Sequence, residues 1–98
     1  MGRFCEILEK TPRNLVIEFL LEMRGLDFSI GDIAKNISLN RATTYNVMKE
    51  FIKKKWVVST RKVSGSNMYK LNTNNKDVKV LIKIFDLILR EVSTTNKK

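Results

Sequence analysis

Three polar side chains spaced three residues apart, at Thr43, Asn46 and Lys49, could contact the edges of nucleic-acid bases. An asparagine amide can form two hydrogen bonds with adenine, a lysine ammonium can donate to guanine, and a threonine methyl can meet a thymine methyl. This spacing places them close together on one side of an α-helix. The same segment supplies four further candidates for contacts to bases or phosphates: Asn40, Arg41, Tyr45 and Lys53. Tyr45 lies on the flank of this helix, where its hydroxyl could donate to a phosphate or its ring could pack at the edge of the core.

A helix that presents these side chains needs an apolar face on its other side. On a helical wheel, that side of residues 40–54 is mostly apolar: Thr44, Val47, Met48, Phe51, Ile52 and Lys55. A short apolar-periodic helix is predicted just before it over residues 30–37, with Ser29 as its N-cap. Residues 38–39 form the turn, and Asn40 caps the second helix. These signals predict a helix-turn-helix, a motif whose second helix enters the DNA major groove.

A β-hairpin is predicted to follow. Residues 56–63 and 68–71 are β-prone, and four turn-forming residues separate them: Ser64, Gly65, Ser66 and Asn67. The turn residues are candidates for DNA contacts, together with three cations that flank the turn and would reach an adjacent minor groove or its phosphates: Arg61, Lys62 and Lys70. Alternatively, these charges only protect an exposed sheet edge from aggregation.

Positive charge is concentrated in the same third of the chain. The net charge is +9 over 98 residues, and residues 39–70 contain eight Lys and Arg but one acid, Glu50. Residues 1–38 contain five cations and six acids. A polyanionic partner would explain this distribution, whereas a solvated lysine-rich surface is the alternative. Glu50 could accept a hydrogen bond from cytosine, but a pair with Lys53 or Lys54 is the simpler expectation.

Two helices are predicted to precede the helix-turn-helix, over residues 2–9 and 13–24. Thr11, followed by proline, is a helix-start signal, and Gly25 ends the second helix. Residues 26–28 are expected to be extended, as one short strand.

The order of these elements resembles the winged-helix DNA-binding family. The residues that carry the resemblance are DIAKNISLNRATTYNVMKEFIKKKWVVSTRK, followed by an SGSN wing tip and YKLN. It covers about residues 12–92 and is closest to small transcription regulators of the kind common in archaea. Met48 and Phe51 match the two buried positions before the first wing strand. Lys55 departs from the pattern, because this family usually carries glycine there and a left-handed lysine is strained.

The resemblance implies an α+β fold that is mainly helical. A winged helix-turn-helix, meaning a three-helix core with a β-hairpin wing, would span residues 12–72. A long C-terminal dimerisation helix would span residues 74–92, capped by Asn74 or Asn75, and the whole chain, 1–98, would form a single domain.

Apolar residues in this last helix form two stripes. One keeps heptad spacing through Val78, Leu81, Phe85, Ile88 and Val92, with Ile82 and Leu89 on its flank, and the other contains Val80, Ile84 and Leu87. A helix that covers one small core needs only one stripe. We therefore expect a homodimer, with an interface drawn from both stripes: Val80, Ile84, Leu87, Phe85 and Ile88. Which stripe faces the partner is left open, and a helix buried in an unusually wrapped monomer is the alternative.

The groups that enzymes and metal sites commonly use are missing. The sequence has no histidine and a single cysteine, Cys5, so it contains neither an internal disulfide nor a plausible zinc ligand set. It also has no phosphate-binding glycine loop and no convergent carboxylate pair, so neither an enzyme nor a cofactor is expected. Cys5 is interpreted as a structural thiol, with redox sensing as the alternative. No apolar run approaches ~20 residues, so we expect a cytoplasmic protein with no membrane partner.

Three functional hypotheses follow. The first is a homodimeric, sequence-specific transcription regulator, a repressor rather than an activator, on double-stranded DNA with an inverted-repeat operator. The second is an architectural or partition-type protein that coats DNA with little sequence preference. The third is a winged helix that binds other proteins and has a merely solvated basic face.

Overall fold

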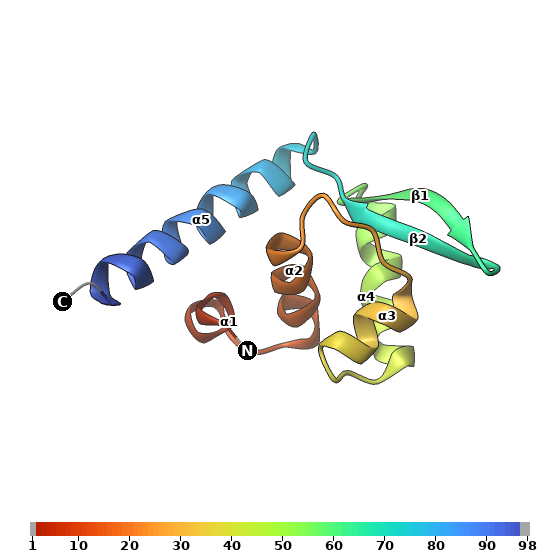
Figure 1. Cartoon of the computed structure of the whole chain (residues 1–98), viewed down its shortest axis with the longest axis horizontal. Coiled ribbons are helices and arrows are strands. Elements are labelled where there is room, and N and C mark those ends of the chain that lie inside the picture. Colours follow the sequence, from red (N-terminus) through yellow and green to blue (C-terminus); the bar gives the residue numbers. More distant parts are fainter. Residues whose placement is uncertain (1, 97–98) are drawn as a thin grey trace.

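Three helices form the centre of the molecule, a β-hairpin extends to one side, and a long C-terminal helix crosses the other (Figure 1). The computed structural model describes the backbone of residues 2–96 and the side chains of residues 2–91. The elements are, in chain order, α1 (Arg3–Leu8), α2 (Pro12–Glu22), α3 (Ile30–Asn36), α4 (Arg41–Lys53), β1 (Val57–Val63), β2 (Ser66–Leu71) and α5 (Lys76–Asn96).

The core surrounds α2, which contacts α1, α4, α5 and β2. Its residues 16–21 are all buried, and α4 contributes Met48 and Phe51, each with 0% of its surface exposed. Strand residues Val57 and Leu71 close the core beneath the hairpin. Burying each large apolar side chain contributes about 1.5–3 kcal/mol, so the contacts of α2 with its neighbours dominate the stability of the fold.

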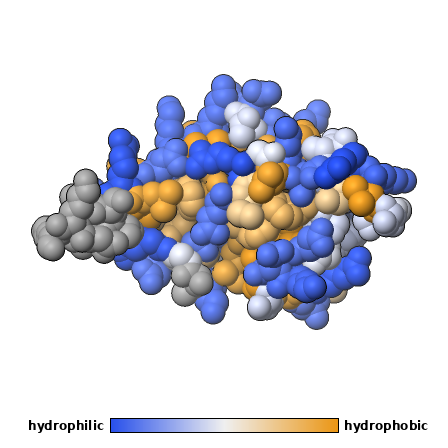
Figure 2. Space-filling view, in the orientation of Figure 1, coloured by the Kyte–Doolittle hydropathy of each residue, from blue (hydrophilic) through white to orange (hydrophobic). Residues whose placement is uncertain are grey.

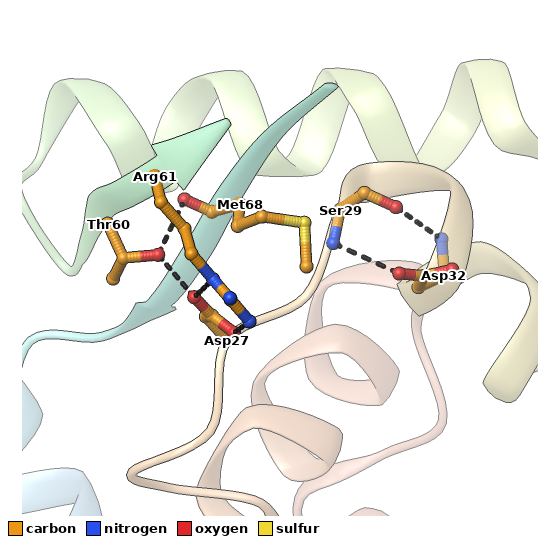
Figure 3. Close-up of polar contacts among 6 residues, drawn as sticks. All are labelled: Asp27, Ser29, Asp32, Thr60, Arg61 and Met68. Carbon is orange, nitrogen blue, oxygen red and sulfur yellow. Dashed lines mark hydrogen bonds and ion pairs between the residues drawn. The ribbon is translucent and has the colours of Figure 1, made fainter. Parts of the chain in front are cut away.

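Side-chain caps start four of the helices where the sequence indicates. Each cap oxygen accepts backbone N–H groups of the first helical turn: Thr11, Ser29, Asn40 and Asn75. Ser29 and Asp32 cap each other reciprocally (Figure 3). Of the two predicted caps for α5, Asn75 is the one used. These polar contacts fix where α3 and α4 begin.

The turn between α3 and α4 lies at Ser38 and Leu39, as predicted. Ser38 has a left-handed φ of 54°, and the Leu39 N–H donates to the carbonyl of Ala34 at 2.9 Å. Ala34 is only 5% exposed and belongs to α3, which packs against α4.

The corner after α4 is left-handed at Lys55, with a φ of 62°, although the residue is lysine. The Lys55 and Trp56 N–H groups donate to carbonyls of the last turn of α4, a pattern that ends helices. The amides of Asn72 and Asn75 both donate to the Lys55 carbonyl, at 2.9 and 3.3 Å. Four hydrogen bonds therefore hold the left-handed corner, although lysine replaces the glycine usual in this family.

The hairpin has a shorter turn than predicted. Only Ser64 and Gly65, with φ of 49° and 81°, form it, and Ser66 and Asn67 already belong to β2. Two consecutive positive φ angles make a turn whose twist matches that of paired strands, which lets pairing begin at once. The expected extended segment before α3 pairs with the hairpin as a single bridge between Phe28 and Tyr69.

The C-terminal helix α5 uses one of its two apolar stripes within the chain. Phe85 and Ile88, which we expected at a dimer interface, are 5% and 7% exposed, so this part of the prediction is corrected. The reason is α1, whose Phe4 ring lies 6.0 Å from that of Phe85. The helix also runs to Asn96, past its predicted end at residue 92. The side chain of Val92 and residues 97–98 lie outside the described part.

The second stripe stays at the surface. Val80, Ile84 and Leu87 are 55%, 36% and 52% exposed. Leu89 is also exposed, and apolar side chains reach the surface between α5 and helices α1 and α2 (Figure 2). Hydrophilic residues border them.

A buried carboxylate attaches α1 to α2. Glu18 is 5% exposed and accepts hydrogen bonds from the N–H groups of Gly2 and Cys5, at 3.2 and 3.3 Å. Burial, followed by the neighbouring Glu18 charge, raises the pKa of the Cys5 thiol to about 11. The thiol is therefore buried and protonated at neutral pH, the state of a structural cysteine.

Candidate nucleic-acid interface

The polar face of α4 lies at the surface, and its apolar face is buried. Asn46, Lys49 and Lys53 are exposed, and Thr43 is half-buried. On the opposite side Thr44 is fully buried, and its hydroxyl donates to the Asn40 carbonyl. Arg41 and Tyr45 are exposed near the start of the helix. The predicted base-facing residues therefore share one accessible surface.

Glu50, the one acid among residues 39–70 (the basic third of the chain), forms ion pairs that neutralise its charge. Glu50 accepts from Arg13 at 2.9 Å and from Lys54 at 2.8 Å. The Arg13 hydrogen bond, followed by that from Lys54, lowers the pKa of Glu50. Of the pairings expected from the sequence, that with Lys54 is the one formed, and Arg13 was not foreseen. An anion beside the positive face is thereby cancelled.

Trp56 packs against the core at the base of the hairpin. Its ring stacks on Phe51 with centroids 5.2 Å apart, and the cations of Arg13 and Lys54 lie 5.2 and 5.0 Å from its centre. Its indole N–H donates to Asp77 at the start of α5. One side chain thus joins α2, α4 and α5 where the hairpin begins.

Most cations of the basic third remain available. Within the part of the chain that the structure describes, six of the eight form no ion pair: Arg41, Lys49, Lys53, Lys55, Lys62 and Lys70. The Lys49 ammonium lies 5.9 Å from the centre of the Tyr45 ring, which is 52% exposed and does not pack in the core. These groups provide positive charge on α4 and on the hairpin without an internal counter-ion.

Arg61 differs from the other hairpin cations. Its Nε and Nη2 atoms donate to the two carboxylate oxygens of Asp27, at 3.0 and 3.2 Å. The Thr60 hydroxyl donates to the same carboxylate (Figure 3). The pairing register shifts between Ser59 and Arg61, which leaves Thr60 as an extra residue in β1. We expected Arg61 to reach a DNA groove together with Lys62 and Lys70. In the structure, Arg61 instead holds the hairpin to the segment before α3.

Replacing Asp27 by asparagine is expected to loosen the hairpin. Arg61 would lose its ion pair, and the Tyr69 and Phe28 N–H groups, which pair beside it, would exchange with solvent faster. Hydrogen bonds from Arg61 and Thr60 lower the pKa of Asp27, so in the natural chain the tie persists as pH falls through the ordinary aspartate range, about 3.9, and is lost below the folded pKa.

Hydrogen exchange resolved by residue measures both effects. Thr60→Val serves as the control, because it removes the contacts of the Thr60 hydroxyl with Asp27 and the Met68 carbonyl and keeps the ion pair. Equal protection of Tyr69 in the natural chain and in Asp27→Asn would contradict the role of this carboxylate.

Comparison with known proteins identifies the fold of this chain. No protein-family model and no curated protein matches the chain. Solved structures do, among them MepR of Staphylococcus aureus in complex with DNA, with a TM-score of 0.65 at 19% identity over 97% of this chain and 77% of that one. This chain has the winged helix-turn-helix fold.

Two further winged-helix structures are similar at low identity. A possible transcriptional regulator from Methanosarcina mazei matches with a TM-score of 0.61 at 14% identity, over 95% of this chain and 78% of that one. The antimony-specific transcriptional repressor AntR matches at 0.63 and 11%, over 90% and 73%. In these terms α3 and α4 are the helix-turn-helix and β1–β2 is the wing. The winged-helix fold that the resemblance implied is confirmed, and the archaeal type stays a prediction.

Other classes of site find no support in the described residues. No cluster of three or more His, Cys, Asp and Glu side chains there could hold a metal ion. None of the described helices has the length and apolar character needed to cross a membrane.

Proposed function

We propose that this winged helix binds double-stranded DNA sequence-specifically and regulates transcription as a homodimer. The observation that carries the proposal is the exposed face of α4, where base-reading side chains and cations without counter-ions lie together. The structural likeness to MepR, whose complex with DNA has been solved, supports it. Occupying a promoter would block polymerase, and AntR is a repressor of similar fold, so repression is the expected sign.

In this proposal the contacts divide by chemistry. Thr43, Asn46 and Lys49 would face base edges in the major groove. Phosphates would be contacted from α4 by Asn40, Arg41, Tyr45 and Lys53, and from the wing by Ser64, Gly65, Lys62 and Lys70. The wing would lie on the adjacent minor groove or its backbone.

The exposed stripe of α5 would form the dimer interface. Val80, Ile84 and Leu87 recur at intervals of four and three residues, so they share one side of the helix. A two-fold axis there would present two copies of α4 to one side of the DNA. The operator would then be an inverted repeat with half-sites about one helical turn apart.

Selection of bound sequences from a random DNA pool at about physiological salt tests this function, together with the mass of the free protein. One short palindromic site and a dimer are the expected results. Extended protection without a preferred site would indicate a DNA-coating protein instead. If the protein shifts no DNA duplex in a gel at low salt, the remaining hypothesis is a winged helix that binds other proteins.

Two alanine variants are expected to separate base reading from phosphate binding. Asn46→Ala should cost about 1–3 kcal/mol of discrimination at one base pair. Lys62→Ala should weaken binding to all sequences similarly and reduce the dependence of log affinity on log salt by about one. Titrations of the selected site and its point variants at several salt concentrations measure both. Identical losses of sequence preference in the two variants would refute these roles.

A further inference from the structure

A small hollow of about 230 Å³ lies between the helix-turn-helix and the wing. Three elements line it: the start of α3, the first turns of α4, and the start of β2. Its volume exceeds the ~30 Å³ of one water molecule several-fold, so a group of several heavy atoms fits. The polar side chains that line it are Ser29, Arg41, Tyr45, Ser66, Asn67 and Tyr69.

The lining is rich in hydrogen-bond donors and has a net charge of +1. Arg41 is its cation, and no acidic residue lines it. Within the described chain, no side-chain hydrogen bond or ion pair involves Arg41, Tyr45, Ser66 or Asn67. The hollow therefore presents a guanidinium, hydroxyls and an amide whose donors are unsatisfied by the protein. Such a set suits an oxyanion, because guanidinium binds phosphate oxygens in pairs.

The Arg41 guanidinium lies beside Gly31. A Cβ atom at this position would be 3.5 Å from Cζ of Arg41, so the guanidinium lies against the first turn of α3. Arg41 thus lines the hollow from the side of α3, while Ser66 and Asn67 line it from the wing.

We propose that this hollow holds one backbone phosphate of the DNA. The inference rests on the function proposed above: if α4 lies in the major groove and the wing beside the minor groove, the strand that separates the two grooves must pass between them. The hollow opens at that place. Ser66 and Asn67, predicted as wing-tip residues, then bind the backbone from the base of the shortened turn, and Arg41 binds a phosphate rather than a base.

Single methylphosphonate substitutions in the selected duplex test the assignment, because each removes the charge of one phosphate. In the natural protein, one position per half-site is expected to lower affinity about tenfold. In Arg41→Gln the same substitution should change affinity less than about twofold, since the two losses share one contact. Lys53→Gln is the control: it removes a cation of α4 that does not line the hollow and should keep the full tenfold penalty.

The outcomes separate this inference from the function on which it rests. An unchanged penalty at every position in Arg41→Gln, with DNA still bound, overturns the phosphate site and leaves the function standing. A changed base preference of Arg41→Gln in random-pool selection overturns it as well, because Arg41 would then read a base. Failure of the natural protein to bind any duplex overturns both.

Discussion

An Ile84→Glu, Leu87→Glu double variant is expected to be a monomer of 11.4 kDa, whereas the natural chain should have twice that mass. Both side chains are at the surface of the free chain, so the change should leave the fold intact. In a dimer, however, it would place two carboxylates from each copy in an apolar contact, where burying an unpaired charge costs several kcal/mol. The affinity for a palindromic operator should fall about 10²–10⁴-fold, because the second half-site no longer binds within the same complex.

Analytical ultracentrifugation and DNA titration measure the two effects. Lys79→Glu is the matched control, since it changes the net charge by the same two units on the same helix, away from the stripe. Thermal unfolding verifies that the double variant folds. A double variant that remains dimeric would place the interface elsewhere and refute the proposed role of this stripe.

Phe51→Ala is expected to cause the largest loss of stability, about 3–5 kcal/mol. The Phe51 side chain is fully buried, stacks on Trp56, and lies 5.6 Å from the Arg13 cation. Its removal would leave a cavity where α2, α4 and the wing meet. Since small domains are stable by only about 5–15 kcal/mol, the unfolding midpoint should fall by roughly 15–30 °C.

Ile52→Ala is the control for this variant. Ile52 follows in the same helix but is 38% exposed, so its loss should cost less than about 1 kcal/mol. Thermal unfolding followed by circular dichroism compares the two. A Phe51→Ala protein as stable as Ile52→Ala would show that the cluster beneath the wing does not hold α4 in place.

Local signals predicted the starts of the helices well. Side chains that cap a helix act within three residues, so Ser29 and Asn40 could be identified from their immediate neighbours, and Asn75 was one of two candidates. The predicted length of the wing turn was wrong, and the reason is also local. Ser64 adopts a left-handed conformation that glycine or asparagine usually fills, and the sequence therefore suggested a longer turn.

Long-range contacts could not be predicted in the same way. Asp27 meets Arg61 across 34 positions, and Arg13 meets Glu50 across 37. Neither pair has a periodic pattern that would reveal it. An acid just before the strand that joins the hairpin was the one available hint for Asp27. Phe85 was misplaced for a related reason, since only the fold shows that α1 covers it.

The amide of Asn75 connects the start of α5 to the end of α4. Its oxygen caps α5, while its nitrogen donates to the carbonyls of Lys54 and Lys55 at the end of α4, both at 3.3 Å. With 21 residues, α5 is about 31 Å long. A tilt of roughly 10° at this contact would move its far end by about 5 Å, more than the 3.4 Å rise of one base pair. In the proposed dimer, the distance between the two α4 helices, and with it the operator spacing, would depend on this contact and on the Trp56–Asp77 hydrogen bond beside it.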